Sequence, residues 1–310
     1  MSKDPKFYLV LAIVLVFGFL YAEIEEKRKE EIKNVQKENE KKPVIKLDED
    51  SVKLRAEDDF NVYYFDVGQA DSILIECNDE YMLIDAGNNN DGDGLVNYLK
   101  RLGVSKLKYV VATHAHEDHI GGMDNILYGF DVEHFYMPDV VTTTKTFEDV
   151  VVALEDKKIA FETPEVGYVF YLGSSKFTVL HVGDESDDLN DTSIVVRALF
   201  GNNSFLFMGD ATSKVEERIY NMKIDSDVLK VGHHGSSYSS TNKFLKEVTP
   251  EYAIISSGYG NSYGHPHSEA LNRLKNNNVK IYRTDREGTI IATSDGEFVS
   301  FRSLETNIDG

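Results

Sequence analysis

The sequence predicts an α/β fold in which two β-sheets pack together and helices cover their outer faces. Roughly a dozen short runs of β-forming residues lie between Asp59 and Arg302, and helical patterns fall between and beside them. No low-complexity break or clear repeat divides this region. Sheets and helices that alternate along one chain in this way are stable when the sheets cover each other and helices cover the remaining faces.

The strands are predicted from runs of β-branched and aromatic residues bounded by polar turns. The first three runs, FNVYYFDV, DSILIE and YMLIDA, follow one another closely, which indicates antiparallel pairing. The other predicted strands are LKYVVAT, YVFYL, KFTVLHV, SIVVRALF, SFLFMGD, DVLKVG, YAIISSG, VKIYRTD, GTIIATS and EFVSFR.

The helices are predicted where apolar residues recur at helical spacing. In DGDGLVNYLKRLG, four apolar residues keep that spacing and Gly103 ends the helix. Three more helices are predicted in FEDVVVALEDKK, in TNKFLKEVTP, where Pro250 stops the helix, and in HSEALNRLKNNN.

Residues 1–22 are expected to form an apolar helix that anchors the chain in a membrane. Residues 7–22 carry no charge and follow Lys3 and Lys6. A helix of that length rises about 24 Å, slightly less than the ~30 Å hydrocarbon core of a bilayer. A cleaved signal segment is the alternative, but no small-x-small cleavage site lies near Ala22. Because the lysines precede the span, the catalytic body is expected outside the cytoplasm, either anchored or secreted after cleavage.

Residues 23–58 are predicted to be a charged linker, and residues 59–303 to be the globular domain. The chain has 53 Asp and Glu against 33 Lys and Arg, for a net charge of −20. This charge favours solubility and repels polyanions at long range, so long nucleic acid is a less expected partner. Cys77 is the one cysteine, which excludes an intramolecular disulfide and a cysteine-based zinc site.

The segment HAHEDH, residues 114–119, concentrates three histidines and two acids at the end of a predicted buried strand. Side chains alternate along an extended chain, so His114 and His116 point the same way and can share one ion. Asp118 and His119 follow, where the chain turns toward a Gly-Gly pair and can present them to a second position. Imidazole and carboxylate together suit Zn²⁺, Mn²⁺ or Fe²⁺. The segment therefore predicts a metal centre.

THAHEDHIGG resembles the HxHxDH signature of the metallo-β-lactamase superfamily. The segments FDVGQADSILIE, LIDAG, LFMGDA, DVLKVGHHGS, YGHPHSEALNRL and IYRTDREGTI are similar, in that order, to the β-lactamase-like domain of the ComEC competence family and its stand-alone hydrolase relatives. This resemblance covers nearly all of residues 60–302. It implies a four-layer αββα sandwich with a dinuclear metal site at one edge of the paired sheets. The sequence has a single apolar span and not the polytopic channel of ComEC, so DNA uptake is not implied.

The resemblance also implies roles for individual residues. His114 and His116 are expected to hold the first metal ion, and Asp118 and His119 the second. Asp210 in LFMGDA is expected to bridge the two ions, which are expected to be Zn or Mn. Asp118 and Asp210 are the expected catalytic residues.

Three assignments keep alternatives at this point. His233 of VGHHGS is expected to complete the second site, with His234 as the other choice. Asp85 in LIDAG is expected to hydrogen-bond and orient the ligand loop, although a turn role fits the sequence equally well. Asp210 could instead cap the helix that begins near Thr212.

The third ligand of the first metal ion is left open by the sequence. Lactamase-type members have a histidine in a GHTPGS-like stretch, whereas this chain reads LNDTSIVV. Asn190, Asp191, His181 or a water could fill the place. His134 in VEHFYMP has no partner motif and is expected to be structural.

Residues near the later histidine motifs are candidates for substrate binding. His234 and Ser236 follow the strand of KVGHHGSS, and His265 and His267 precede a predicted helix whose N-terminus could bind an anion. Lys230 is expected to be a solvated strand residue rather than a cleft residue.

The expected reaction is hydrolysis by a water activated between two divalent cations. A small or cell-wall phosphodiester is the favoured substrate, because the second ligand set suits phosphate. Hydrolysis of a lactone or β-lactam is the enzymatic alternative. The third hypothesis is a membrane-tethered binding module on a metal-stabilised scaffold.

Overall fold

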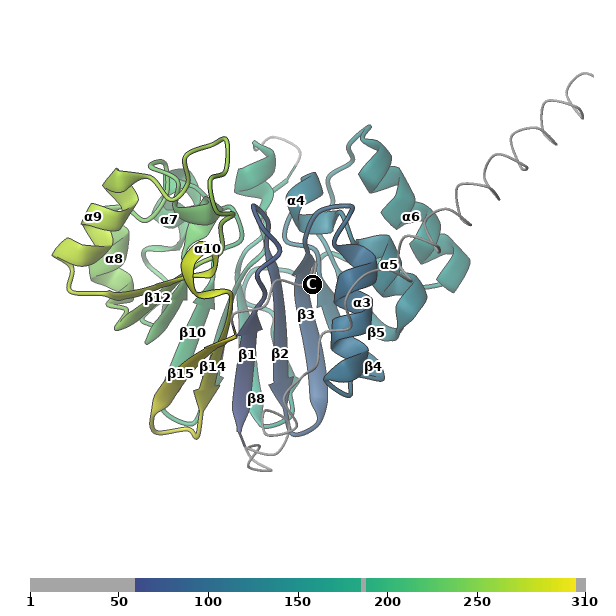
Figure 1. Cartoon of the computed structure of the whole chain (residues 1–310), viewed down its shortest axis with the longest axis horizontal. Helices are drawn as coiled ribbons and strands as arrows, with labels where there is room; N and C mark the ends of the chain where they lie inside the picture. The colour runs from purple at the N-terminus through teal and green to yellow at the C-terminus, as the bar shows by residue number, and fades with distance from the viewer. Residues whose placement is uncertain (1–58, 185–187, 305–310) are drawn as a thin grey trace, which may run out of the picture. The chain divides into compact units, whose positions relative to one another are not determined.

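A computed structural model describes residues 59–184 and 188–304, in which two mixed β-sheets lie face to face with helices beside them (Figure 1). The expected anchor, residues 1–22, and the expected linker, residues 23–58, lie outside these residues. Within them, no helix is both long enough and apolar enough to cross a membrane.

The first sheet has eight strands, antiparallel at one side and parallel at the other. The strands from β15 to β3 pair antiparallel, and those from β3 to β6 pair parallel. Their spatial order is β15 (Val299–Leu304), β14 (Thr289–Ser294), β1 (Phe60–Tyr64), β2 (Ser72–Cys77), β3 (Glu80–Ala86), β4 (Lys106–Val111), β5 (Asp131–Tyr136) and β6 (Phe161–Glu162).

The second sheet has seven strands and is mixed in the same way. The strands from β13 to β10 pair parallel, and those from β10 to β7 pair antiparallel. Their spatial order is β13 (Lys280–Arg283), β12 (Tyr252–Ile255), β11 (Val228–Lys230), β10 (Asn203–Phe207), β9 (Val195–Phe200), β8 (Ser175–His181) and β7 (Val169–Leu172).

Helices flank both sheets (Figure 1). Those of the first half of the domain are α3 (Gly92–Arg101), α4 (Glu117–Ile120), α5 (Met123–Gly129) and α6 (Lys145–Lys157). Those of the second half are α7 (Ser213–Ile219), α8 (Asn242–Val248), α9 (Ser268–Asn276) and α10 (Thr284–Glu287). Two 3₁₀ turns, η1 (Leu189–Thr192) and η2 (Gly232–Gly235), follow strands of the second sheet.

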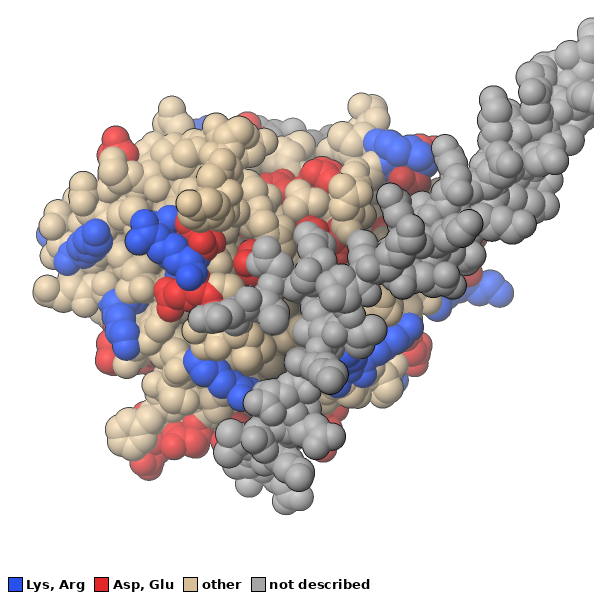
Figure 2. All heavy atoms as spheres, viewed as in Figure 1, with Lys and Arg blue, Asp and Glu red and all other residues tan. Residues whose placement is uncertain are grey.

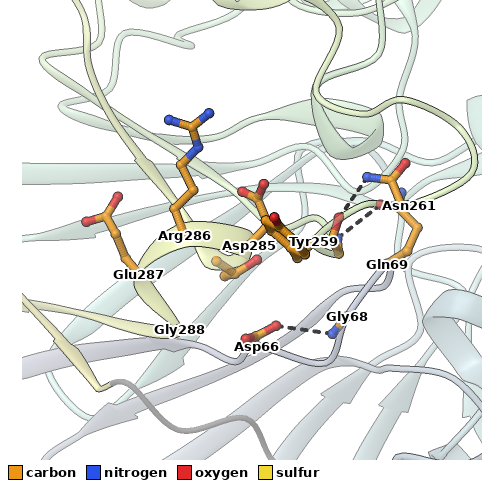
Figure 3. Close-up of a pocket in the computed structure, with 11 residues that line it drawn as sticks. Asp66, Gly68, Gln69, Tyr259, Asn261, Asp285, Arg286, Glu287 and Gly288 are labelled. Atoms are coloured by element: carbon orange, nitrogen blue, oxygen red, sulfur yellow. Dashed lines mark hydrogen bonds between the residues drawn. The ribbon is translucent and has the colours of Figure 1, made fainter.

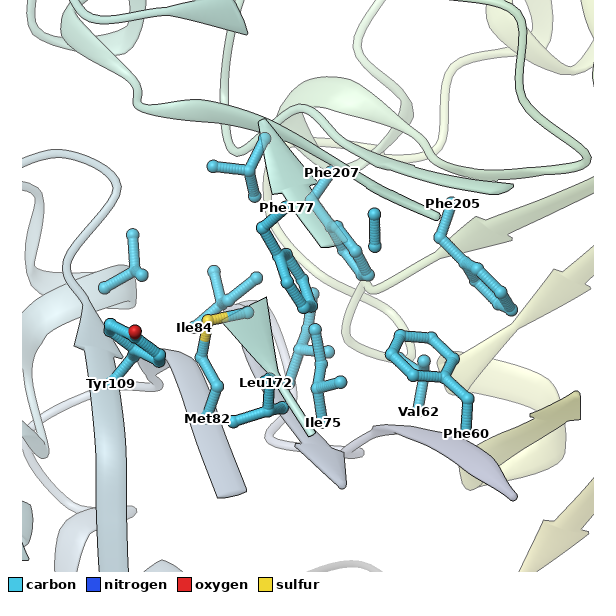
Figure 4. Close-up of a cluster of buried hydrophobic side chains, with 14 of the residues drawn as sticks. Phe60, Val62, Ile75, Met82, Ile84, Tyr109, Leu172, Phe177, Phe205 and Phe207 are labelled. Carbon is cyan, nitrogen blue, oxygen red and sulfur yellow. The ribbon is translucent and has the colours of Figure 1, made fainter. Parts of the chain in front are cut away.

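The main apolar core lies between the two sheets. Phe60 of β1 is 5.0 Å from Phe205 of β10 and 5.6 Å from Phe200 of β9, measured between ring centroids. Figure 4 shows the rings of Phe60 and Phe205 near aliphatic side chains of β1, β2 and β3. A second apolar cluster includes Val215 of α7, Phe244 of α8 and strand residues of the second sheet. Burying these surfaces provides the main stabilisation of the fold and fixes the strand ends that carry the site.

The sequence predicted most of these elements. The antiparallel order of β1, β2 and β3 is confirmed, as are the helices at α3, α6, α8 and α9. Five strands and helices were not predicted: β5 at VEHFY, the two-residue strand β6, the short helices α4 and α5 that follow the histidine motif, and α10 in TDRE. The three helices have seven residues or fewer, and a helical pattern needs a longer window to be recognised in a sequence.

On the face drawn in Figure 2, Lys and Arg side chains alternate with Asp and Glu side chains. No continuous basic surface is visible among the described residues of that face, which agrees with the net charge of −20.

Candidate metal centre

The candidate site forms where strand ends from both sheets meet. His114 and its motif follow β4, and Asp85 lies within the last residues of the neighbouring strand β3. Asp210 follows β10, and His234 follows the adjacent strand β11. Each pair of strands is parallel, so the carboxyl ends of its strands lie at one edge of their sheet. The face-to-face packing of the sheets brings these two edges together.

Four residues form a compact cluster at this edge. Ligand atoms of Asp118, His119, Asp210 and His234 all lie within 4.8 Å of one another. The Asp210 carboxylate is central: Oδ1 lies 3.3 Å from His119 Nε2, and Oδ2 lies 3.6 Å from His234 Nε2. His234 Nε2 is also 3.2 Å from Asp118 Oδ2.

Of the other two histidines of the motif, His114 lies against the same carboxylate and His116 lies against His114. His114 Nε2 is 2.9 Å from His116 Nδ1 and 4.0 Å from Asp210 Oδ2. His114 and His119 are fully buried, with ring centroids 4.1 Å apart, whereas His116 is half-buried. The structure thus brings together His114, His116, Asp118, His119 and Asp210, as the sequence pattern suggested.

This site has the unmet bonding capacity that a cation requires. His119 Nε2 and Asp210 Oδ1 are buried, face each other, and have no hydrogen bond of good geometry among the described residues. Buried polar atoms are rarely left in this state unless an ion or water completes them. Imidazole nitrogen and carboxylate oxygen, without a thiolate, suit Zn²⁺ or Mn²⁺. The donor set therefore fits a metal centre.

Asp85 fixes the orientation of the histidine motif. Its Oδ2 lies 2.8 Å from His119 Nδ1 and accepts the Thr113 hydroxyl at 2.7 Å, while Oδ1 accepts the Thr113 backbone N–H at 2.8 Å. Asp85 has a left-handed backbone, with φ of 57°, which costs free energy and is common at functional sites. Its bond to His119 Nδ1 leaves Nε2 to face Asp210, which is the arrangement that orients a metal-binding imidazole.

The glycines after the motif permit close packing of the ligand loop. The backbone N–H of Gly121 donates to Gly87 O at 2.9 Å. A Cβ on Gly121 would lie 2.2 Å from backbone atoms of Asn88 and Asn89, and one on Gly122 would lie 2.6 Å from Ala86 O. Only glycine allows this approach, which holds α4 and its ligands against the end of β3.

Of the two histidines of η2, the structure places His234, and not His233, in the four-residue cluster. His234 is buried and belongs to the four-residue cluster, and its Nδ1 lies 3.0 Å from Ser256 O, so that Nε2 faces the centre. His233 is outside the cluster, with Nε2 3.8 Å from Asp210 Oδ2. Both have positive φ, 50° and 53°, and this left-handed turn of two residues points the rings in different directions. Sequence alone could not distinguish them, since both follow β11 directly.

The remaining candidates for substrate binding surround this turn. His265 lies beside His233, with ring centroids 5.4 Å apart. Ser236 is buried, and its hydroxyl accepts the Tyr238 backbone N–H. His267 Nδ1 accepts the backbone N–H of Ser237 at 3.0 Å, which gives this histidine a structural bond in the same loop.

Two of the three residues considered for the open ligand position, His181 and Asp191, have other side-chain bonds. His181 Nδ1 lies 3.0 Å from Ser193 O, and its Nε2 lies 3.2 Å from Arg218. Asp191 accepts the backbone N–H and the hydroxyl of Thr212. Asn190 Oδ1 is buried and has no hydrogen-bond partner among the described residues.

The helix-cap alternative for Asp210 is wrong, because Thr212 caps α7. The Thr212 hydroxyl accepts the backbone N–H of Lys214 at 3.3 Å. Asp210 instead donates its own backbone N–H to the Ser193 hydroxyl oxygen, at 3.1 Å. Its carboxylate is thereby free to face the histidines.

An ion pair that the sequence did not reveal lies behind the centre. Lys230 was expected to be solvated, which is wrong: its side chain is fully buried, with Nζ 2.6 Å from Asp71 Oδ2. Asp71 Oδ1 is 3.5 Å from His234 Nδ1. Asp71 also groups with Asp85 and His119, their ligand atoms lying within 4.8 Å of one another. The available signal was a lysine in the otherwise apolar strand DVLKV.

Charges within the cluster shift its pKa values strongly. Burial alone lowers the pKa of His119, but the carboxylates of Asp210 and Asp85 outweigh it and hold that pKa well above its usual value. Burial raises the pKa of Asp210, yet His119 and His234 hold it well below its usual range. Burial, followed by the charge on His119, lowers the pKa of His114 well below its usual value. The raised pKa of His119 favours its protonated form, whereas the lowered pKa values of His114 and Asp210 favour the unprotonated forms that can bind a cation.

Comparisons with known proteins agree with this fold. A family model described as the metallo-beta-lactamase superfamily matches residues 65–259. ComE operon protein 3 of Bacillus subtilis (strain 168) is 33% identical over 201 residues, which cover 63% of this chain and 26% of that protein. Competence protein ComA of Neisseria gonorrhoeae is 31% identical over 245 residues, which cover 76% of this chain and 32% of that protein. The matched part is thus about a quarter to a third of the length of these relatives.

Among solved structures, CmlA, a diiron beta-hydroxylase from Streptomyces venezuelae, is similar with a TM-score of 0.51. It is 12% identical, and the match covers 81% of this chain and 55% of that one. At this identity the likeness concerns the fold alone.

Proposed function

The chain belongs to the metallo-beta-lactamase superfamily, and from that premise we propose that it is a metallohydrolase that cleaves a phosphodiester with two divalent cations. His114 and His116 would hold the first ion, and Asp118, His119 and His234 the second. Asp210 would bridge them. The observation that carries the proposal is the position of the Asp210 carboxylate, with one oxygen toward His119 and the other between His114 and His234.

The cations, Zn²⁺ or Mn²⁺, would supply Lewis acidity, which makes water a better nucleophile near neutral pH and offsets negative charge on the substrate. Asp210 is almost fully buried, and its lowered pKa keeps it ionised between the histidines. The Asp118 side chain is 29% exposed, so this carboxylate is reachable from solvent and can orient the attacking water. Asp85 keeps the His119 ring in its orientation through the contact with Nδ1.

A small or cell-wall phosphodiester is the substrate class that we propose. Two cations next to three or more carboxylates give a locally positive pocket in an acidic protein, which suits one phosphate group. A long nucleic acid needs many phosphate contacts along a basic surface. The face drawn in Figure 2 has no such surface among its described residues, and the net charge of the chain is −20.

Hydrolysis of bis(4-nitrophenyl) phosphate by the metal-loaded protein tests the proposal. We expect turnover with Mn²⁺ or Zn²⁺, loss of turnover on addition of a chelator, and loss of at least about a hundredfold in kcat for His116→Ala, as for a removed group of the reaction centre. His134→Ala is the matched control, because His134 is a partly exposed histidine on β5 bonded to Glu162. Equal activity of the two variants would overturn the proposal.

The same experiment separates the alternatives. Turnover of a lactone but of no phosphodiester would assign an acyl hydrolase. If neither is turned over and metal removal only lowers the melting temperature, a metal-stabilised binding module is the correct assignment.

We also propose that residues 1–22 tether the catalytic domain to the outer face of a membrane. The support is the uncharged stretch of residues 7–22. Mass spectrometry of the full-length protein from the membrane fraction tests it: intact residues 1–22 support an anchor, and a mature chain that lacks them supports a cleaved signal.

A further inference from the structure

A cavity lies between three loops at the carboxyl ends of strands. It has a volume of about 570 Å³ and is large enough for a ring-sized group. The loops follow β1, β12 and β13, and Figure 3 shows their side chains around the cavity. The residues that the argument uses are Asp66, Gln69, Tyr259, Asp285, Arg286 and Glu287.

One side chain joins this cavity to the metal centre. Gln69 lines the cavity, and its Oε1 accepts the backbone N–H of Gly258 at 3.1 Å. Its Nε2 lies 3.3 Å from His265 Nδ1, and the ring of His265 lies next to that of His233. Gln69 and His265 therefore connect the cavity wall to the turn that carries His233 and His234.

The carboxylates of the cavity wall already have partners. Asp285 accepts Arg283 Nε at 2.8 Å, and Glu287 accepts the backbone N–H of Arg283 at 3.0 Å. Asp66 accepts the backbone N–H of Gly68 at 3.2 Å. These bonds fix the wall and reduce its capacity to bind a further cation.

Two large side chains of the cavity have no such partner. Tyr259 is 90% exposed, and neither it nor Arg286 has a hydrogen bond, ion pair or ring contact among the described residues. An exposed tyrosine ring offers a flat apolar face that a planar group can cover. The guanidinium of Arg286, in the same cavity, offsets the carboxylates, so that a group attached to a phosphate is not repelled.

We propose that this cavity is a subsite for a planar ring carried by the phosphorus group at the metal centre, and that Tyr259 is its stacking residue. The proposal rests on the proposed function, since the metal centre must bind the phosphorus group. It assigns the substrate class more narrowly, to phosphate esters in which at least one substituent is a planar ring. Gln69 sets the boundary between the two parts of the site.

Binding of two simple phosphonates to the metal-loaded full chain tests the subsite. Phenylphosphonate and methylphosphonate share the anionic group and differ in the ring. We expect calorimetric dissociation constants at least about fivefold lower for phenylphosphonate in the wild type, since aromatic pairs add roughly 0.5–1.5 kcal/mol beyond area burial. Tyr259→Ala should reduce this preference to about twofold or less, and Tyr259→Phe should keep it.

The matched control is Tyr171→Ala, because Tyr171 is 54% exposed on β7, at the opposite edge of the second sheet from β13. Circular dichroism of each variant checks folding, which the exposed position of Tyr259 should leave unchanged. A wild type without preference, or a Tyr259→Ala variant that keeps it, would overturn the subsite.

The two proposals fail separately. If the preference depends on Tyr259 but no phosphodiester is turned over, the proposed reaction is wrong and the ring subsite stands. If bis(4-nitrophenyl) phosphate is hydrolysed while the preference is independent of Tyr259, the reaction stands and the subsite is wrong.

Discussion

Lys230 and Asp71 form an ion pair inside the domain, with Nζ 2.6 Å from Oδ2 and neither side chain more than 1% exposed. The pair joins the second sheet, through β11, to the loop before β2 of the first. Asp71 also donates its backbone N–H to Asp118 O at 3.1 Å and lies 3.5 Å from His234. The ion pair thus supports two proposed metal ligands from behind.

Replacement of Lys230 should destabilise the metal-free protein strongly. In Lys230→Met, Asp71 would remain buried without its charge partner, and breaking a buried pair in this way costs about 3–5 kcal/mol. Urea unfolding in the presence of a chelator measures the free energy of unfolding.

Lys176→Met, at an exposed position of β8, is the control and should change that free energy by less than about 0.5 kcal/mol. The double variant Asp71→Leu with Lys230→Met should recover part of the loss, because no lone charge stays buried. If Lys230→Met is as stable as the control, the pair has no structural role of this kind.

The architecture was predictable from the sequence because its signals are local. FNVYY and SILIEC are short runs of β-forming residues that are buried at every position, and residues 92–101 keep helical spacing, so each element is recognisable within its own segment. The short helices α4 and α10 have four residues each, which is about one turn and too few for a periodic pattern.

The site was predictable only in part, since its geometry depends on contacts between distant segments. HAHEDH contains its candidate ligands within six consecutive residues, so this part of the site can be recognised from one segment of the sequence. The partnership of Asp71 with Lys230 spans 159 positions, and no local pattern encodes it. His234 rather than His233 belongs to the cluster because the backbone of both residues is left-handed, and the sequence of two adjacent histidines does not predict that conformation.

Asp85→Asn should weaken metal binding while preserving the fold. Asparagine tolerates the left-handed backbone at this position and can still accept the Thr113 N–H. Its amide group would face His119 Nδ1 as a second donor, and the imidazole would lose its orientation. Loss of such a supporting bond typically lowers metal affinity by about 10–100-fold. Competition with a chromophoric chelator measures the affinity.

Asp139→Asn is the matched control for this prediction, since Asp139 is exposed after β5 and away from the cluster. Unchanged affinity in Asp85→Asn, with the control also unchanged, would show that Asp85 has only a turn role.

The two histidines of η2 should differ in their effect on metal content. His234→Ala removes a nitrogen of the four-residue cluster and should reduce the bound metal from about two ions per chain toward one. His233→Ala should keep the wild-type stoichiometry, because His233 lies outside that cluster. Elemental analysis after dialysis measures both. Loss of metal in His233→Ala alone would return the ligand role to His233.

Metal binding should release protons and weaken as the pH falls. The carboxylates around His119 outweigh its burial and raise its pKa well above the usual value, and those near His234 raise its pKa in the same way. In the metal-free protein both imidazoles therefore retain their protons to a higher pH than a free imidazole does, although a metal ion binds only the neutral ring. Asp210 and Asp118 release none, because their pKa values are lowered and they are already ionised.

Calorimetric titrations with Mn²⁺ in two buffers of different ionisation enthalpy count the released protons. We expect one to two per chain at pH 7 and, for each proton, about a tenfold loss of apparent affinity per pH unit below the raised pKa values. Above those pKa values the protons are already gone, so the affinity should become independent of pH. An equal heat in both buffers, with an affinity that does not change between pH 6 and pH 8, would show that these histidines are neutral before the metal binds.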